Sequence, residues 1–152
     1  MSGLTLTVLT SAEWPRDVEP PKLAGFVHSD FNPLIAAVAG RCLEAAPGPE
    51  PETAVMLVSD EGDIASAEHV AKAVDAGTRI GPLFFFQSVP NAVLGHVAAK
   101  WGLTGPVSCL CDTASALDSA RGLLADEDAR RVLLIDVTAD PATAVLLSEG
   151  TT

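Results

Sequence analysis

Short apolar runs alternate along the chain with longer stretches whose apolar residues recur at helical spacing. The alternation of Leu and Val with Thr over residues 4–9 predicts a half-buried strand. Continuous apolar runs over 53–58 and 131–136 have the length of strands and the composition of strands covered on both faces. Shorter apolar runs over 108–111 and 143–147 predict two more strands.

Amphipathic stretches between these runs predict helices over residues 33–46, 64–76, 90–101 and 113–124. Asn32 is expected to cap the first helix, with Pro33 at its first position. Gly77 and Gly102 follow the second and third helices, where a glycine commonly ends a helix in the left-handed conformation.

This alternation predicts an α/β fold with a mostly parallel sheet flanked by helices. The sequence shows no internal repeat and no second domain, and the Pro-rich segment 47–51 is too short for a domain linker. Residues 1–152 are therefore expected to form a single domain, long enough to bury a substantial core.

Charge narrows the possible partners. The 152 residues include 9 Lys and Arg against 20 Asp and Glu, a formal net charge of −11. Nine scattered positive charges do not provide the basic face that binds nucleic acid or an anionic membrane. The chain has no Tyr and only 5% aromatic residues, which argues against a base-stacking surface. Neither nucleic acid nor a membrane is therefore expected as a partner.

The sequence pattern also lacks targeting and metal-binding signals. No apolar run approaches the length that spans a bilayer, and residues 1–5 lack the basic start of a signal peptide. The cysteines, Cys42, Cys109 and Cys111, fit no Cys–His zinc pattern. A reducing cytoplasm is the expected location, and no metal or cofactor is implied.

One part of the chain combines several short motifs in a specific order. Ser88, Pro90, Asn91 and Gly95 lie at the start of a predicted helix, and Gly102-Leu103-Thr104-Gly105-Pro106 follows it. A short strand and the run Ser115-Ala116-Leu117-Asp118-Ser119-Ala120 come next. This order resembles the β-ketoacyl synthase family, the condensing enzymes of fatty acid and polyketide synthesis. The resemblance covers residues 50–140 well and the first 50 loosely, and it implies a layered, thiolase-like half-fold, the truncated N-terminal half of a ketosynthase.

The sequence departs from this family at the catalytic nucleophile. In the family, a cysteine stands at the start of the helix after the short strand. Three possible registers place Ala114, Thr113 or Ser115 at that position, and none of them is a cysteine. The family's catalytic histidines, or histidine and lysine, lie in a C-terminal half without a counterpart here. The resemblance therefore implies a chain that does not condense acyl groups on its own.

Ser115 and Cys111 remain as weak candidates for a catalytic nucleophile. A serine needs a general base, usually a histidine, and the sequence pattern places none beside Ser115. The simpler interpretation is a small helix residue or a cap. Cys111 is the thiol nearest to the family's nucleophile position, but it lies earlier, on the predicted strand.

Cys109 and Cys111 are two residues apart, so their side chains point to the same side of the predicted strand. They could form a redox or metal-binding pair. Cysteines on an apolar strand are more often small core residues, and this is the expectation adopted for both.

Two apolar segments are candidates for an interface or an acyl tunnel. The triplet Phe84-Phe85-Phe86 needs cover on both sides if all three rings are to be buried, and a partner could provide it. In the resembling family, the strand before the nucleophile pairs across a two-fold axis with a partner subunit. The residues of this strand here are Val107, Cys109, Leu110 and Cys111.

The resemblance therefore favours a non-catalytic subunit, similar to the chain-length factors of type II polyketide and aryl-polyene systems, that pairs with a condensing enzyme. An acidic acyl carrier protein would meet it only indirectly, because like charges repel. One alternative is a self-associating structural or regulatory homodimer. Another is a small acyl-thioester hydrolase or acyltransferase that uses Ser115 or Cys111.

Overall fold

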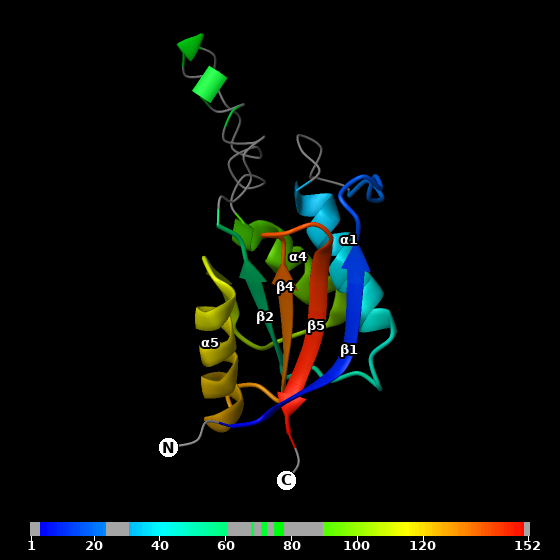
Figure 1. Ribbon diagram of the computed structural model, residues 1–152, viewed down its shortest axis with the longest axis vertical. Helices are drawn as coiled ribbons and strands as arrows, with labels where there is room; N and C mark the ends of the chain where they lie inside the picture. Colours follow the sequence, from blue (N-terminus) through cyan, green and yellow to red (C-terminus); the bar gives the residue numbers. More distant parts are fainter. Residues whose placement is uncertain are drawn as a thin grey trace.

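The computed structural model describes residues 4–23, 31–60, 68, 71–72, 75–77 and 90–150. Its strands are β1 (Leu6–Trp14), β2 (Thr53–Val58), β3 (Val107–Leu110), β4 (Arg131–Asp136) and β5 (Ala142–Glu149). Its helices are α1 (Phe31–Glu44), α4 (Pro90–Trp101) and α5 (Thr113–Ala125). The helices flank a five-stranded sheet of order β1-β5-β4-β2-β3, with α5 on one face and α1 and α4 on the other (Figure 1). The layered α/β architecture expected from the sequence is confirmed.

The sheet is mostly parallel, as expected: of its five described strands, β1, β2, β3 and β4 run in the same direction and β5 runs against them (Figure 1). β2 pairs in parallel with β3 and with β4, but β5 pairs antiparallel with both β4 and β1. The physical reason lies in the connection between β4 and β5, because residues 137–141 are too few for the crossover that a parallel neighbour requires. β5 therefore turns back beside β4, and β1 adds to its outer side.

Several predicted elements are observed with the expected bounds. β2, β4 and α4 match their predicted ranges, and Gly102 follows α4 with a φ of 69°. Gly77 has a φ of 68°, as expected for a helix end, although most of the helix predicted over 64–76 lies outside the described residues. None of the described helices is long and apolar enough to cross a membrane.

The first helix begins earlier than predicted. α1 starts at Phe31, so Asn32 lies inside its first turn and the assignment of Asn32 as the cap is wrong. Asn32 and Pro33 are both buried, because the start of α1 packs against the core instead of projecting into solvent.

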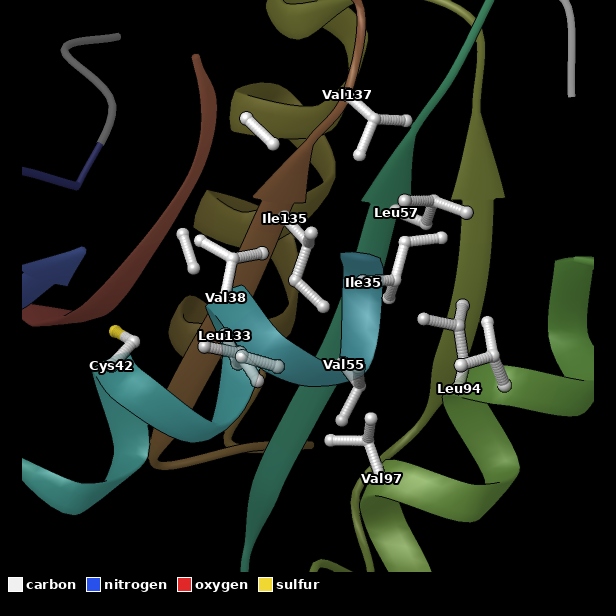
Figure 2. Close-up of a cluster of buried hydrophobic side chains, with 14 of the residues drawn as sticks. Ile35, Val38, Cys42, Val55, Leu57, Leu94, Val97, Leu133, Ile135 and Val137 are labelled. Atoms are coloured by element: carbon white, nitrogen blue, oxygen red, sulfur yellow. The ribbon is translucent and has the colours of Figure 1, made fainter. Parts of the chain in front are cut away.

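The core is divided between the two faces of the sheet. Along β2, Val55 and Leu57 point toward α1 and α4, whereas Ala54, Met56 and Val58 point toward α5. Figure 2 shows side chains from α1 and α4 meeting those of β2 and β4 on the first of these faces. β2 is buried at every position, as its continuous apolar run predicts.

A close backbone approach joins the turn after α4 to the start of β2. Thr104 donates its N–H to the Pro51 carbonyl at 2.7 Å, and Gly105 donates to the Thr53 carbonyl at 3.2 Å. A Cβ atom built on Gly105 would lie 2.5 Å from the carbonyl carbon and oxygen of Thr53. Only glycine fits at this position, and the turn delivers the chain into β3 beside β2.

Candidate functional site at the exposed edge strand

The carboxyl ends of the three parallel strands meet at one end of the sheet. Ser59, just after β2, donates its N–H to the Leu110 carbonyl at the end of β3 at 3.0 Å. On the other side of β2, Val137 donates to the Val58 carbonyl at 3.1 Å. The residue after β3 and the first turn of α5 therefore lie at the sheet end where ligands of open α/β folds commonly bind.

Polar side chains at this sheet end form a small hydrogen-bonded network. Thr113, the first residue of α5, donates its hydroxyl to Asp136 Oδ2 at 3.1 Å. Thr138 donates both its N–H and its hydroxyl to Asp136 Oδ1, at 2.8 and 2.6 Å. The network fixes the start of α5 against the end of β4. Its one signal in the sequence is that polar residues stand at the end of one predicted strand and within two residues after the ends of both.

Asp112 caps α5 and holds Ser115. The Asp112 carboxylate accepts the Ser115 N–H at 2.8 Å and the Ser115 hydroxyl at 3.0 Å. An aspartate just before a predicted helix is a recognised N-cap signal, which the interpretation of Ser115 itself as a cap overlooked. Ser115 lies in the first turn of the helix, and its hydroxyl hydrogen is engaged by the capping carboxylate.

This geometry provides little activation for a serine nucleophile. The two hydrogen bonds from Ser115, first that of its N–H and then that of its hydroxyl, lower the pKa of Asp112. A carboxylate with a lowered pKa is a weaker base than an ordinary aspartate. Among the described residues the one histidine, His96, belongs to α4 on the opposite face of the sheet, while His28 and His69 lie outside the described residues.

The capping role of Asp112 leads to a pH-dependent prediction. A carboxyl whose pKa is lower in the folded chain stabilises the fold above its unfolded pKa of about 3.9, and this contribution is lost as the pH falls through the lower folded value. We expect Asp112→Ala to lower the Tm by a few degrees near pH 7. The difference from wild type should shrink below about pH 4.

Thermal melts at about pH 7 and about pH 3 test this expectation. Asp112→Asn is the matched control, because asparagine also caps helices well without an ionisable group, and it should stay close to wild type near neutral pH. An Asp112→Ala difference that is the same at both pH values would contradict the assigned role of the carboxylate.

The two neighbouring cysteines are exposed, so the expectation that they are core residues is wrong. Cys109 belongs to β3, and Cys111 directly follows this strand. Because β3 is an edge strand of the sheet, no other described strand lies beside the two cysteines on the open side. Burial of its sulfur and the proximity of Cys111, in that order, raise the pKa of the Cys109 thiol. Cys42, by contrast, is buried in α1, and its pKa is raised by that burial. The described residues contain no group of three or more His, Cys, Asp or Glu that could hold a metal.

The edge strand β3 differs from every other parallel strand in its exposure. Val107 and Cys109 are exposed and Ser108 and Leu110 half-buried, whereas its neighbour β2 is buried throughout. β3 pairs with β2 on one side, and no described strand pairs with it on the other. The predicted interface residues Val107, Cys109, Leu110 and Cys111 thus lie together along one sheet edge. The other predicted interface segment, Phe84-Phe85-Phe86, lies outside the described residues.

The similarity of this chain to known proteins is seen in their structures and not in their sequences. No protein-family model matches the sequence, and no curated protein is detectably similar to it. A ketosynthase (ApeO) in complex with its chain length factor (ApeC) from Xenorhabdus doucetiae matches with a TM-score of 0.73 at 17% identity, over 99% of this chain and 81% of that chain. The ishigamide ketosynthase/chain length factor matches with a TM-score of 0.72 at 15% identity, over 84% of this chain and 46% of that chain.

A β-ketoacyl synthase from Burkholderia phymatum STM815 matches with a TM-score of 0.72 at 9% identity, over 98% of this chain and 60% of that chain. This chain therefore spans less than two thirds of the ishigamide and Burkholderia chains, but most of the chain matched in the Xenorhabdus complex. At these identities the likeness is one of fold: the chain adopts the ketosynthase-like, thiolase-type α/β fold.

Proposed function

We propose that this chain is a non-catalytic ketosynthase-like subunit, of the chain-length-factor type, that pairs with a cysteine-bearing condensing enzyme of type II polyketide, polyene or fatty-acid-like biosynthesis. The observation that supports it best is the exposed apolar edge strand β3. No strand of the described residues pairs with its open side, where another strand can add by β-augmentation through the backbone donors and acceptors.

The composition of β3 supports a role in pairing. Edge strands are usually protected by charged residues or proline, which discourage the addition of a foreign strand. β3 has the sequence Val-Ser-Cys-Leu, with neither. The opposite edge strand, β1, carries Glu13 and is followed by Pro15. The contrast between the two edges of one sheet favours β3 as the side on which a partner strand adds.

The first turn of α5 supports a non-catalytic role. Its residues, Thr113, Ala114 and Ser115, include no thiol, and the Ser115 hydroxyl is bonded to a carboxylate of lowered pKa. A condensing partner would therefore supply the nucleophile. The Xenorhabdus match supports such a subunit, because 99% of this chain aligns with 81% of one chain in a complex of a ketosynthase and its chain length factor.

The test combines native mass spectrometry with thiol labelling of the chain co-expressed with a cysteine-bearing ketosynthase from the same source. In the isolated folded chain, we expect iodoacetamide to modify Cys109 and Cys111 but not the buried Cys42. In a one-to-one complex, pairing at β3 should cover Cys109 and slow its modification. Peptide mapping assigns each modified cysteine.

Two controls make the labelling result interpretable. Cys42 should become reactive only when the chain is unfolded in guanidinium, which confirms that access governs the reaction. A homodimer that protects Cys109 and ignores the ketosynthase would replace the proposal by the self-associating module. A complex that forms while Cys109 remains fully reactive would place the interface elsewhere on the chain.

A further inference from the structure

The positive charges of this acidic chain are unevenly distributed. Three of its nine lysines and arginines, Lys22, Arg41 and Lys100, line one groove of about 360 Å³ between the end of β1, α1 and α4. Both tryptophans of the chain, Trp14 and Trp101, line it as well. We call this the cationic groove. It lies on the face of the sheet opposite α5 and does not include β3.

These three cations are not neutralised by neighbouring carboxylates. In the described part of the chain, Arg121 and Arg130 form salt bridges, whereas Lys22, Arg41 and Lys100 form none. One carboxylate, Glu44, also lines the groove, so that positive charge predominates in its lining. An excess of positive charge gathered in one concave site of a −11 protein favours an anionic occupant.

The groove is held in shape by its aromatic residues. The Arg41 guanidinium stacks on the Trp14 ring, 4.1 Å from its centroid, and donates to the Glu13 carbonyl at 2.7 Å. The Trp14 indole donates to the Val18 carbonyl at 2.9 Å. Lys100 lies over the Trp101 ring at 5.8 Å, with its ammonium group exposed to solvent on α4. The Arg41 guanidinium and the Lys100 ammonium group are therefore positioned before any ligand arrives.

A second cavity, of about 420 Å³, adjoins the groove and shares Trp101 and Glu44 with it. Its lining is largely apolar and includes Leu43, Ala46, Leu103 and Leu146. Its one cation, Arg131, is committed to the carbonyls of Pro47 and Gly48. We call this the apolar cavity. Its volume and that of the cationic groove both fall in the range of about 300–1,000 Å³ seen for small-ligand pockets.

We propose that the cationic groove and the apolar cavity together bind a single-chain amphiphile, with its anionic head, a carboxylate or a phosphate, between Lys22 and Lys100 and its acyl tail beyond Trp101. Charge places the head at the cationic end, and the hydrophobic effect places the tail against the leucines. The site is independent of the pairing proposed for β3 and can be tested on the isolated chain.

The chain provides its own reporter for this site. Trp14 and Trp101 are its only tryptophans and it has no tyrosine, so all tryptophan emission comes from the cationic groove. Titration with dodecanoate or dodecyl phosphate, below their micelle-forming concentrations, should shift this emission to a saturable end point. The affinity should rise about 2- to 4-fold per methylene from octanoate to dodecanoate, as expected for tail burial.

Variants of the two exposed lysines locate the head. Lys22→Gln and Lys100→Gln should each weaken dodecanoate binding about 3-fold, and about tenfold together. Lys72→Gln, at an exposed lysine outside the groove, is the matched control and should leave the Kd unchanged. Arg41 is left intact because it also supports Trp14.

Three outcomes would overturn the proposal. Dodecyltrimethylammonium could bind as tightly as dodecanoate, which would exclude recognition of an anion. The double lysine variant could bind like Lys72→Gln, which would place the site elsewhere. Emission could respond to phosphatidylglycerol vesicles but not to the soluble probes, which would assign the groove to a lipid surface instead of a free acyl anion.

Discussion

Replacement of Gly105 by alanine is expected to lower the free energy of unfolding by about 3 kcal/mol or more, among the larger effects of a single substitution. The added Cβ would lie 2.5 Å from the Thr53 carbonyl group and 2.6 Å from the Ala54 nitrogen. These are backbone atoms at the start of a fully buried strand, so they cannot rotate away as a side chain would. The turn must move, and its hydrogen bond to Thr53 is then strained or lost.

Urea denaturation of wild type and variant measures this effect. Gly122→Ala, in α5, is the matched control, because its added Cβ meets no atom within 4 Å. Alanine is favoured over glycine inside a helix, so this variant should gain about 0.5–1 kcal/mol. A Gly105→Ala variant as stable as wild type would show that the close contact with β2 is not required by the fold.

Val107→Glu is expected to weaken binding of a ketosynthase partner about 100-fold or more, the cost of burying an unpaired charge in an interface. Val107 is 37% exposed in the isolated chain, so the substitution should leave its own fold intact. Surface plasmon resonance or native mass spectrometry of the complex measures the loss.

The opposite edge of the same sheet provides the control. Val8, on β1, is 57% exposed, and Val8→Glu introduces the same charge on the other edge strand. It should leave the complex unchanged. If both variants bind the ketosynthase as wild type does, β3 is not the pairing surface. If both variants lose binding, the added negative charge weakens the complex wherever it is placed, and the result does not assign the interface to β3.

Helices and strands whose own residues carry a clear hydrophobic pattern or end signal were predictable from the sequence. The continuous apolar runs of β2 and β4 indicated strands covered on both faces, and Gly102 indicated the end of α4 because glycine accepts a positive φ. β1 was predicted to end at residue 9 but continues to Trp14, because pairing with β5 along its whole length extends it. Such pairing depends on residues far away in the chain and leaves no periodic signal.

The candidate site was predictable in position but not in exposure. The motif order correctly predicted a short strand followed by a helix start, and Cys111 and Asp112 lie between the two. The apolar composition of residues 108–111 suggested burial of both cysteines, because a strand inside a sheet and one at its open edge can share the same composition. Strand order, which decides between them, is a property of the whole sheet.

The antiparallel pairing of β1 with β5 has a consequence for folding during synthesis of the protein. β1 leaves the ribosome first among the strands, yet the strand that it pairs with, β5, is the last of them to be made. The nascent chain must therefore keep an unpaired, Val- and Leu-containing strand until nearly all of the sheet has been translated. Contacts between residues that are far apart in the sequence slow folding, and an unpaired strand is prone to aggregate until its partner strand is available. A stalled or slowly translated message should thus yield more aggregated chain than one that is translated without pause.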